Sequence, residues 1–118
     1  MNESILQSIK KLLGIVPEYT AFDEDIIMNI NSVFSVLAQL GISGAQGFKI
    51  TNEEAVWGDV IDESYDMEMI KTYIFMKVKL MFDPPLNSSV LQSYKEQIQE
   101  LEWRLNIECD ETLKLDEE

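Results

Sequence analysis

Residues 73–107 read YIFMKVKLMFDPPLNSSVLQSYKEQIQELEWRLNI, and this stretch decides the fold because it joins an almost wholly apolar helix to an amphipathic one. The Asp-Pro-Pro at 83–85 forces a turn, since proline fixes φ and disfavours the α conformation of the residue before it. The Asn-Ser-Ser at 87–89 supplies N-cap candidates for the next helix. Spacings of three and four residues then form one apolar seam, made of Leu91, Tyr94, Ile98, Leu101 and Leu105. The stretch predicts a helical hairpin that buries this seam, and it carries no residue suited to catalysis.

The rest of the apolar pattern predicts an all-α fold, a small bundle of about five helices. The expected helices cover residues 4–13, 23–40, 51–61, 66–82 and 88–106. Asp23 is expected to cap the second helix, and a capping box of Thr51 and Glu54 is expected to start the third. The helix over 66–82 is apolar around most of its circumference, so we expect it to be central, with Ile74 in the core.

The segment between the second and third expected helices, GISGAQGFKI at 41–50, contains three glycines. Glycine clusters are typical of loops, so we expect a long glycine-containing loop here, with a short extended segment at 48–50. The chain of 118 residues is long enough for one domain. We expect a single helical domain over 1–107, followed by an acidic, flexible tail over 108–118.

Composition excludes several classes of site and location. Histidine is absent, which removes the commonest general base and metal ligand, and with one cysteine a structural zinc site is excluded. These absences argue against catalysis, whereas a magnesium or calcium site made of carboxylates stays possible, although no EF-hand-like spacing is present. No apolar run is long enough to cross a membrane, and the N-terminus lacks the pattern of a signal peptide. The single Cys109 cannot form an internal disulfide, which favours a cytosolic origin.

The net charge of −13 is concentrated in two places. Between Lys49 and Lys71 there are seven acids and no base, namely Glu53, Glu54, Asp59, Asp62, Glu63, Asp66 and Glu68. The segment after Ile107 adds six more acids against one lysine. Such a surface repels nucleic acid, whose affinity for proteins comes mostly from lysine and arginine. The acids are either a solvated surface or a surface for a basic partner or for non-adhesion to DNA.

Three aromatic side chains are candidates either for the core or for an interface. Trp57 and Trp103 fit both interpretations, but Trp103 lies off the apolar seam of its helix, which favours a second contact surface there. Tryptophan is enriched at interface hot spots. Phe48, between a glycine and a lysine, is either a loop anchor or a contact residue.

The chain resembles the small head–tail connector, or head-completion, proteins of tailed bacteriophages. The resemblance rests on the opening SIKKLLGI and YTAFDEDIIMNINSVFSVLAQLGI, on GAQGFKIT and EEAVWGDVI, and on MIKTYIFMKVKLMFDPPLNSSVLQSYKEQIQELEWRLNI. It covers about Ser4 to Ile107, and its most specific parts are FDPP and LEWRLN.

This resemblance implies a helical adaptor in the virion, at the head–tail junction, assembled in the host cytoplasm. It also implies no enzyme activity and no required cofactor. It implies a homo-oligomeric ring beneath the portal protein that extends the DNA channel and docks a downstream tail or stopper protein. DNA would pass through without tight binding, and the sequence leaves open whether the isolated subunit is a monomer. The expected interface residues are Phe48, Lys49, Ile50, Trp57 and Trp103, with Leu113 and Leu115 as anchor candidates in the tail. The expected channel-facing or partner-facing acids are Glu53, Glu54, Asp59, Asp62 and Glu63.

Two other classes stay open at this stage. An acidic protein that mimics DNA and inhibits a nucleic-acid-binding protein would show rows of carboxylates at phosphate-like spacing. The clustering of acids in the 51–61 segment and the tail argues mildly against it. A small enzyme with paired carboxylates such as Asp62 and Asp66 is the other alternative, and no motif supports it.

Overall fold

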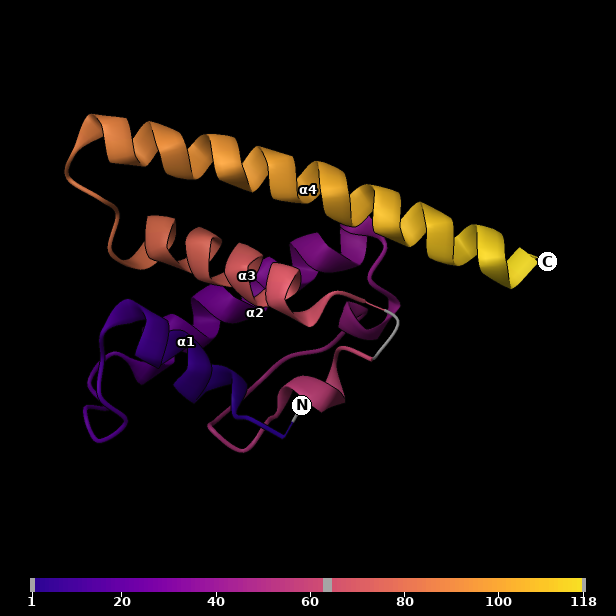
Figure 1. Cartoon of the computed structure of the whole chain (residues 1–118). Helices are drawn as coiled ribbons and strands as arrows, with labels where there is room; N and C mark the ends of the chain where they lie inside the picture. Colours follow the sequence, from indigo (N-terminus) through magenta and orange to yellow (C-terminus); the bar gives the residue numbers. More distant parts are fainter. Residues whose placement is uncertain (1, 63–64, 118) are drawn as a thin grey trace.

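The computed structural model describes the backbone of residues 2–62 and 65–117, and the side chains of those ranges as far as Cys109 (Figure 1). The described chain folds into four α-helices and contains no strand, so the predicted all-α class is confirmed. The helices are α1 (Ile5–Leu13), α2 (Asp23–Leu40), α3 (Met67–Phe82) and α4 (Ser88–Glu117). Two short 3-10 turns, η1 (Ser43–Ala45) and η2 (Trp57–Asp59), lie between α2 and α3.

Local sequence signals set most of the helix ends. The Ser4 hydroxyl accepts a hydrogen bond from the backbone N–H of Gln7 and caps α1, while Gly14 ends that helix in the left-handed conformation at φ 83°. The Asp66 carboxylate accepts from the N–H of Met69 at 3.2 Å and caps α3. Of the candidates at 87–89, the Asn87 side chain caps α4.

The prediction that Asp23 caps α2 was wrong. The residue before the helix, Phe22, makes no side-chain cap hydrogen bond, and Asp23 is already the first helical residue. Its carboxylate instead lies 2.8 Å from the Nζ of Lys10 on α1. A buried lysine needs a counter-charge more than a helix start needs this cap, so the carboxylate turns toward Lys10.

The prediction of a helix over 51–61 was also wrong. The backbone of this segment pairs with residues next to α1: the N–H of Ile5 donates to Ala55 O at 3.0 Å, and the N–H of Trp57 donates to Glu3 O at 3.2 Å. These backbone groups are therefore not available for helical hydrogen bonds, and only the turn η2 forms. Instead of the expected capping box, the Asn52 side chain accepts from the N–H of Glu54.

The segment at 48–50 forms no strand. The backbone N–H and carbonyl of Ile50 bond to a side chain rather than to a neighbouring strand. The Asn31 amide on α2 donates to Ile50 O at 3.0 Å and accepts from the N–H of Ile50 at 2.8 Å. This pair of hydrogen bonds fastens the end of the 41–50 segment to α2 and buries the Ile50 side chain.

The central helix is α3, as its sequence predicts. It packs against α1, α2 and α4, and Figure 1 shows α4 on one side of α3 and α1 on the other. Tyr73, Ile74 and Val78 on α3 are completely buried. The apolar circumference of α3 is therefore covered by three helices at once.

The predicted seam of α4 faces the body of the protein. Ile98 and Leu105 are buried, and Tyr94 and Leu101 are partly buried against the core, while Leu91 at the start of the seam is half-buried. The seam continues one turn further than expected, to the buried Cys109, which packs closely against the Cα of Gly41. The helix itself runs on to Glu117 through the segment predicted to be a tail, and its last turns extend past the other helices (Figure 1). None of the helices in the described chain has the length and apolarity needed to cross a membrane.

Replacing Ile74 with alanine tests the central position of α3. We expect Ile74→Ala to lower the free energy of unfolding by about 2–5 kcal/mol, through lost burial and a residual cavity. Chemical denaturation followed by circular dichroism measures the change. The control is Met28→Ala, which truncates an exposed side chain on α2 and should change stability by less than about 0.5 kcal/mol. A loss below about 1 kcal/mol for Ile74→Ala would show that α3 is not the centre of the core.

Candidate protein-interaction surfaces

The structure places the predicted interface residues in different environments. Ile50 and Trp57 are buried in the subunit, so they are not available on its surface. Phe48 is half-buried, with its ring edge against Phe34 at a centroid distance of 5.3 Å, which makes it a loop anchor. Lys49 and Trp103 are exposed. The side chains of Leu113, Leu115 and Glu63 lie outside the described residues.

Trp57 belongs to a network that fastens the 51–61 segment to the bundle. Its indole Nε1 donates to the hydroxyl of Ser8 on α1 at 3.0 Å, and the Nζ of Lys71 on α3 lies 5.5 Å from the centre of its ring. A buried tryptophan needs a partner for its N–H, and Ser8 provides it. The side chain therefore stabilises the subunit rather than an interface.

Glu3 extends this network to the N-terminus. Its carboxylate accepts from the Ser8 hydroxyl at 2.8 Å and pairs with Lys71 at 3.3 Å. The hydrogen bond from Ser8, and then that from Lys71, hold the pKa of Glu3 below its ordinary value. Because both partners favour the charged carboxylate, this contact is present above the ordinary pKa of a glutamate and is lost as the pH falls.

The most exposed aromatic side chain that the structure describes is Trp103 on α4, at 65% exposure. Residues two positions apart on a helix point about 200° apart, and Trp103 is two residues from both Leu101 and Leu105 of the seam. It therefore points away from the body, and Ile107, one turn later, shares its face and is also exposed. A tryptophan placed in this way has no packing role within the subunit.

Charged side chains surround Trp103. Glu100, one turn before it, pairs with Arg104 at 2.9 Å. Glu96 lies a further turn back on the same face and is exposed. The exposed indole is thus flanked by two carboxylates on its N-terminal side, and we call this surface, made of Glu96, Glu100, Trp103 and Ile107, the outer face of α4.

A hydrogen bond between α3 and α4 fixes the rotation of this face. The hydroxyl of Tyr73 donates to the carboxylate of Glu102, the residue next to Trp103, at 2.7 Å. Desolvation of the buried ring, and then the hydrogen bond to Glu102, raise the pKa of Tyr73 well above its ordinary value. Because the Glu102 carboxylate of α4 is held against α3 by this hydrogen bond, the neighbouring Trp103 indole points away from α3.

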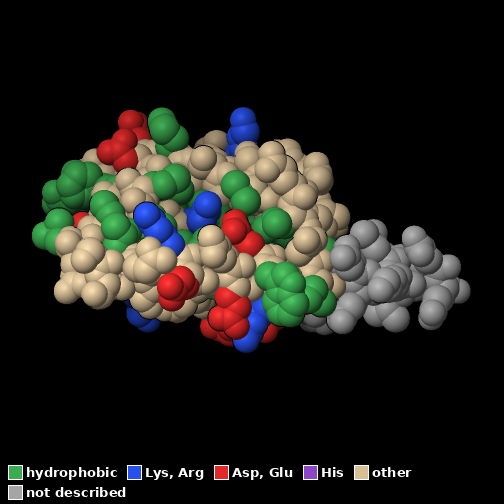
Figure 2. Space-filling model, turned by 90° about the horizontal axis from the view of Figure 1, so that it is seen from above, with side chains coloured by type: hydrophobic (Ala, Val, Ile, Leu, Met, Phe, Trp, Pro, Cys, Tyr) green, Lys and Arg blue, Asp and Glu red, His purple; other side chains and the backbone are tan. Residues whose placement is uncertain are grey.

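A second apolar surface lies at the end of the bundle where α3 turns into α4. Phe22 contacts Tyr19 and Phe82 with ring centroids 5.6 and 5.3 Å away, which brings the start of α2 and the end of α3 together. Figure 2 shows apolar side chains gathered at the end opposite the undescribed segment. We call this surface the apolar end. Its exposed members are Leu12, Val16, Tyr19, Phe22, Met81, Leu86 and Val90.

A buried lysine holds the loop that carries part of the apolar end. Lys10 is completely buried, and its Nζ donates to Pro17 O at 3.2 Å and to Tyr19 O at 2.8 Å while it pairs with Asp23. Two hydrogen bonds and one ion pair therefore compensate for the burial of this ammonium group. Sequence reasoning missed this residue and the apolar end. The only signal was the presence of Ile15, Val16, Tyr19 and Phe22 in a segment without helical spacing.

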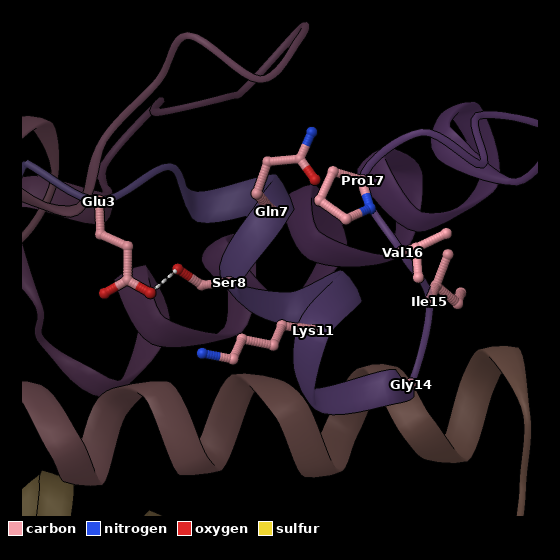
Figure 3. Close-up of a pocket in the computed structure, with 8 residues that line it drawn as sticks. All are labelled: Glu3, Gln7, Ser8, Lys11, Gly14, Ile15, Val16 and Pro17. Atoms are coloured by element: carbon pink, nitrogen blue, oxygen red, sulfur yellow. Dashed lines mark hydrogen bonds between the residues drawn. The ribbon is translucent and has the colours of Figure 1, made fainter.

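A groove lies beside this loop, between it and α1 (Figure 3). It has a volume of about 440 Å³, and its wall is mainly apolar, with Ile15, Val16 and Pro17 on one side. Gln7 and Lys11 of α1 line the other side. The Gln7 amide oxygen is buried and has no hydrogen-bond partner among the described residues, while its nitrogen donates to Glu53.

The predicted acids do not act as one group. Asp59 accepts from the N–H of Val56 at 3.0 Å, so it stabilises the turn η2. Glu53 and Glu54 line a shallow hollow of about 490 Å³ together with Asp23 and Glu24 at the start of α2. Asp62 is exposed and has contacts of its own. Within the described part of the chain, no group of acids or of Cys109 with acids is arranged to hold a metal ion.

Comparison with known proteins gives one match. A family model described as phage connector protein matches residues 5–112. No curated protein and no solved structure gives a significant match.

The contact between Tyr73 and Glu102 predicts a dependence of stability on alkaline pH. Because the folded state holds the pKa of Tyr73 above its ordinary value of about 10, folding favours the protonated phenol. This stabilisation is complete below pH of about 10 and is lost as the pH rises further. We expect Tyr73→Phe to lower the free energy of unfolding by about 1 kcal/mol at neutral pH and to reduce its further fall above pH of about 10.

Urea unfolding at a series of pH values measures both effects. The matched control is Tyr94→Phe, which changes a half-buried tyrosine of the α4 seam and should keep the steep alkaline loss of the parent. An equal alkaline loss in Tyr73→Phe and the parent would contradict this role of Tyr73.

Proposed function

Because the family match covers residues 5–112, the chain belongs to the phage connector proteins, and from this we propose that it is a ring-forming adaptor beneath the portal of a tailed phage. Membership of the family gives a structural connector role in the virion. We propose in addition that the ring extends the DNA channel of the portal and docks a downstream tail or stopper protein.

The construction of the subunit supports an adaptor. Its buried polar groups, including Lys10, Ser8 and Tyr73, are engaged in contacts that join one helix or loop to another. The surfaces that remain are the outer face of α4 and the apolar end, both of which expose large apolar side chains. Exposed apolar patches on a rigid framework are typical of protein–protein contact sites.

The single observation that carries the proposal is the family match, and the exposed Trp103 is the structural feature that fits it best. A side chain of this size, turned away from its own core and held there by the neighbouring Glu102, is suited to anchor a contact with another subunit or protein.

We propose that acidic side chains keep the adaptor from adhering to DNA that passes through it. The net charge is −13, and the exposed Glu53, Glu54 and Asp62 lie on one segment between α2 and α3. Carboxylates repel the phosphate backbone, so a surface of this kind lets DNA slide without retention. A basic partner protein is the alternative target for the same surface.

We also propose that the last turns of α4, beyond Cys109, dock the adaptor onto a partner. The body of the protein ends with the buried Cys109, while α4 runs on to Glu117. In the sequence of this extension, Leu113 and Leu115 lie between the acids at 110–111 and those at 116–118.

Electron microscopy of the protein with the portal protein of the same phage tests the proposed function. We expect class averages of the mixture to show an added ring coaxial with the portal. A variant truncated after Asp110 keeps Cys109 in the core, so we expect it to melt like the full chain but to bind the portal more weakly. Portal particles without added density would contradict the adaptor role, and full binding by the truncated variant would contradict only the role of the extension.

Binding to free DNA tests the charge argument separately. We expect no binding to a duplex at physiological salt, because the chain has 22 acids against nine bases and its affinity for phosphate should be negligible. Fluorescence anisotropy of a labelled duplex measures this, with a basic DNA-binding protein as the positive control. A dissociation constant in the micromolar range would contradict a channel that DNA passes without retention.

A further inference from the structure

We propose that two different faces of this subunit are complementary, and that Trp103 of one copy enters the groove beside α1 of the next copy. The inference rests on the proposed ring, since it names the contact that would join neighbouring subunits. The exposed indole and the groove are independent features of the fold, and neither has a role within the subunit.

The positions of Trp103 and of the groove exclude a contact between them within one subunit. α1 and α4 lie on opposite sides of α3 (Figure 1), so a subunit cannot place its own outward-pointing Trp103 in its own groove. A contact between the two is therefore between copies and uses a different face of each. Contacts of this type leave one free face at each end, so they add further copies and form a closed ring when the rotation between neighbours allows it.

The groove has the size and the apolar wall that an indole side chain requires. The groove of about 440 Å³ has more room than one indole needs, and Ile15, Val16 and Pro17 give it an apolar wall. Val16 is exposed and stands at its edge, where an entering ring would cover it. Aromatic anchors in apolar pockets carry most of the binding energy in many interfaces.

The polar groups of the groove and of the outer face of α4 are also complementary. Lys11 lines the groove and makes no ion pair with any residue that the structure describes, although its charge helps to lower the pKa of Glu3 on the same wall. The outer face of α4 brings two carboxylates with its tryptophan. Glu100 is already paired with Arg104, so the exposed Glu96 is the counter-charge that we assign to this lysine. An entering indole also brings one N–H donor, and the buried Gln7 amide oxygen in the groove wall has no hydrogen-bond partner among the described residues.

The charge of the whole chain favours this pairing of unlike faces over pairing of like faces. At a net charge of −13, most contacts between identical patches bring acid against acid. Two copies of the outer face of α4 would place Glu96 and Glu100 against each other. The Lys11 side of the groove is the surface where that acidic face meets a cation.

The test uses two variants that each remove one face. Trp103→Ala keeps the groove and lacks the anchor, and Val16→Asp keeps the anchor and blocks the groove with a charge. Both positions are exposed, so each variant should fold and melt like the parent. Sedimentation velocity over a concentration series measures self-association, and Met28→Ala, at an exposed apolar position on α2, is the matched control.

We expect the parent and Met28→Ala to form higher oligomers as the concentration rises, and each face variant to associate about tenfold or more weakly. An equal mixture of the two face variants restores one interface per pair, so it should form dimers and nothing larger. If Trp103→Ala or Val16→Asp associates like the parent, or if the mixture forms no dimer, the face pairing is wrong. A parent that binds the portal as a ring while both variants also form that ring would overturn this inference and leave the proposed function standing.

Discussion

The structure depends on the burial of one helix on three sides. α3 carries apolar side chains around most of its surface, so α1, α2 and α4 must all cover it. The turn at 83–85 sets the direction of α4, because the chain cannot continue as a helix into two prolines and has to fold back along α3. Once α4 lies there, its seam is occupied as far as Cys109, and the side of the helix with Trp103 is left facing outward.

Four polar contacts then fix the elements that the core alone would leave loose. Lys10 holds the loop before α2, Asn31 holds Ile50, Ser8 holds Trp57, and Tyr73 holds Glu102 on α4. Each joins segments far apart in the sequence or a loop to a helix, and each involves at least one group shielded from water. Removing one partner of such a pair leaves the other without a hydrogen bond, which typically costs about 1–3 kcal/mol. The surfaces that these contacts hold in place are those available to other proteins.

Sequence reasoning was most successful where a periodic pattern and a local end signal agree. The helix over 66–82, with Asp66 before it and proline after it, matches α3 (Met67–Phe82), and the seam of α4 faces the core as expected. It failed at 51–61, where backbone pairing with Glu3 and Ile5 outweighs a local helix signal, because propensity carries no information about distant partners. For the same reason the sequence left Trp57 open between the core and an interface, and the structure buries it with its N–H bonded to Ser8. Trp103 was left open in the same way, and its exposure agrees with its position off the apolar seam.

The subunit exposes two surfaces with large apolar side chains, the outer face of α4 and the apolar end, which agrees with membership of the phage connector proteins. The central claim is that this protein joins the head to the tail. Deleting its gene from the phage that encodes it, and counting particles by electron microscopy, tests that claim most directly. The account predicts heads and tails that assemble separately and do not join, with infectivity restored by the parent chain supplied in trans. Normal numbers of tailed, infectious particles from the deletion phage would contradict it.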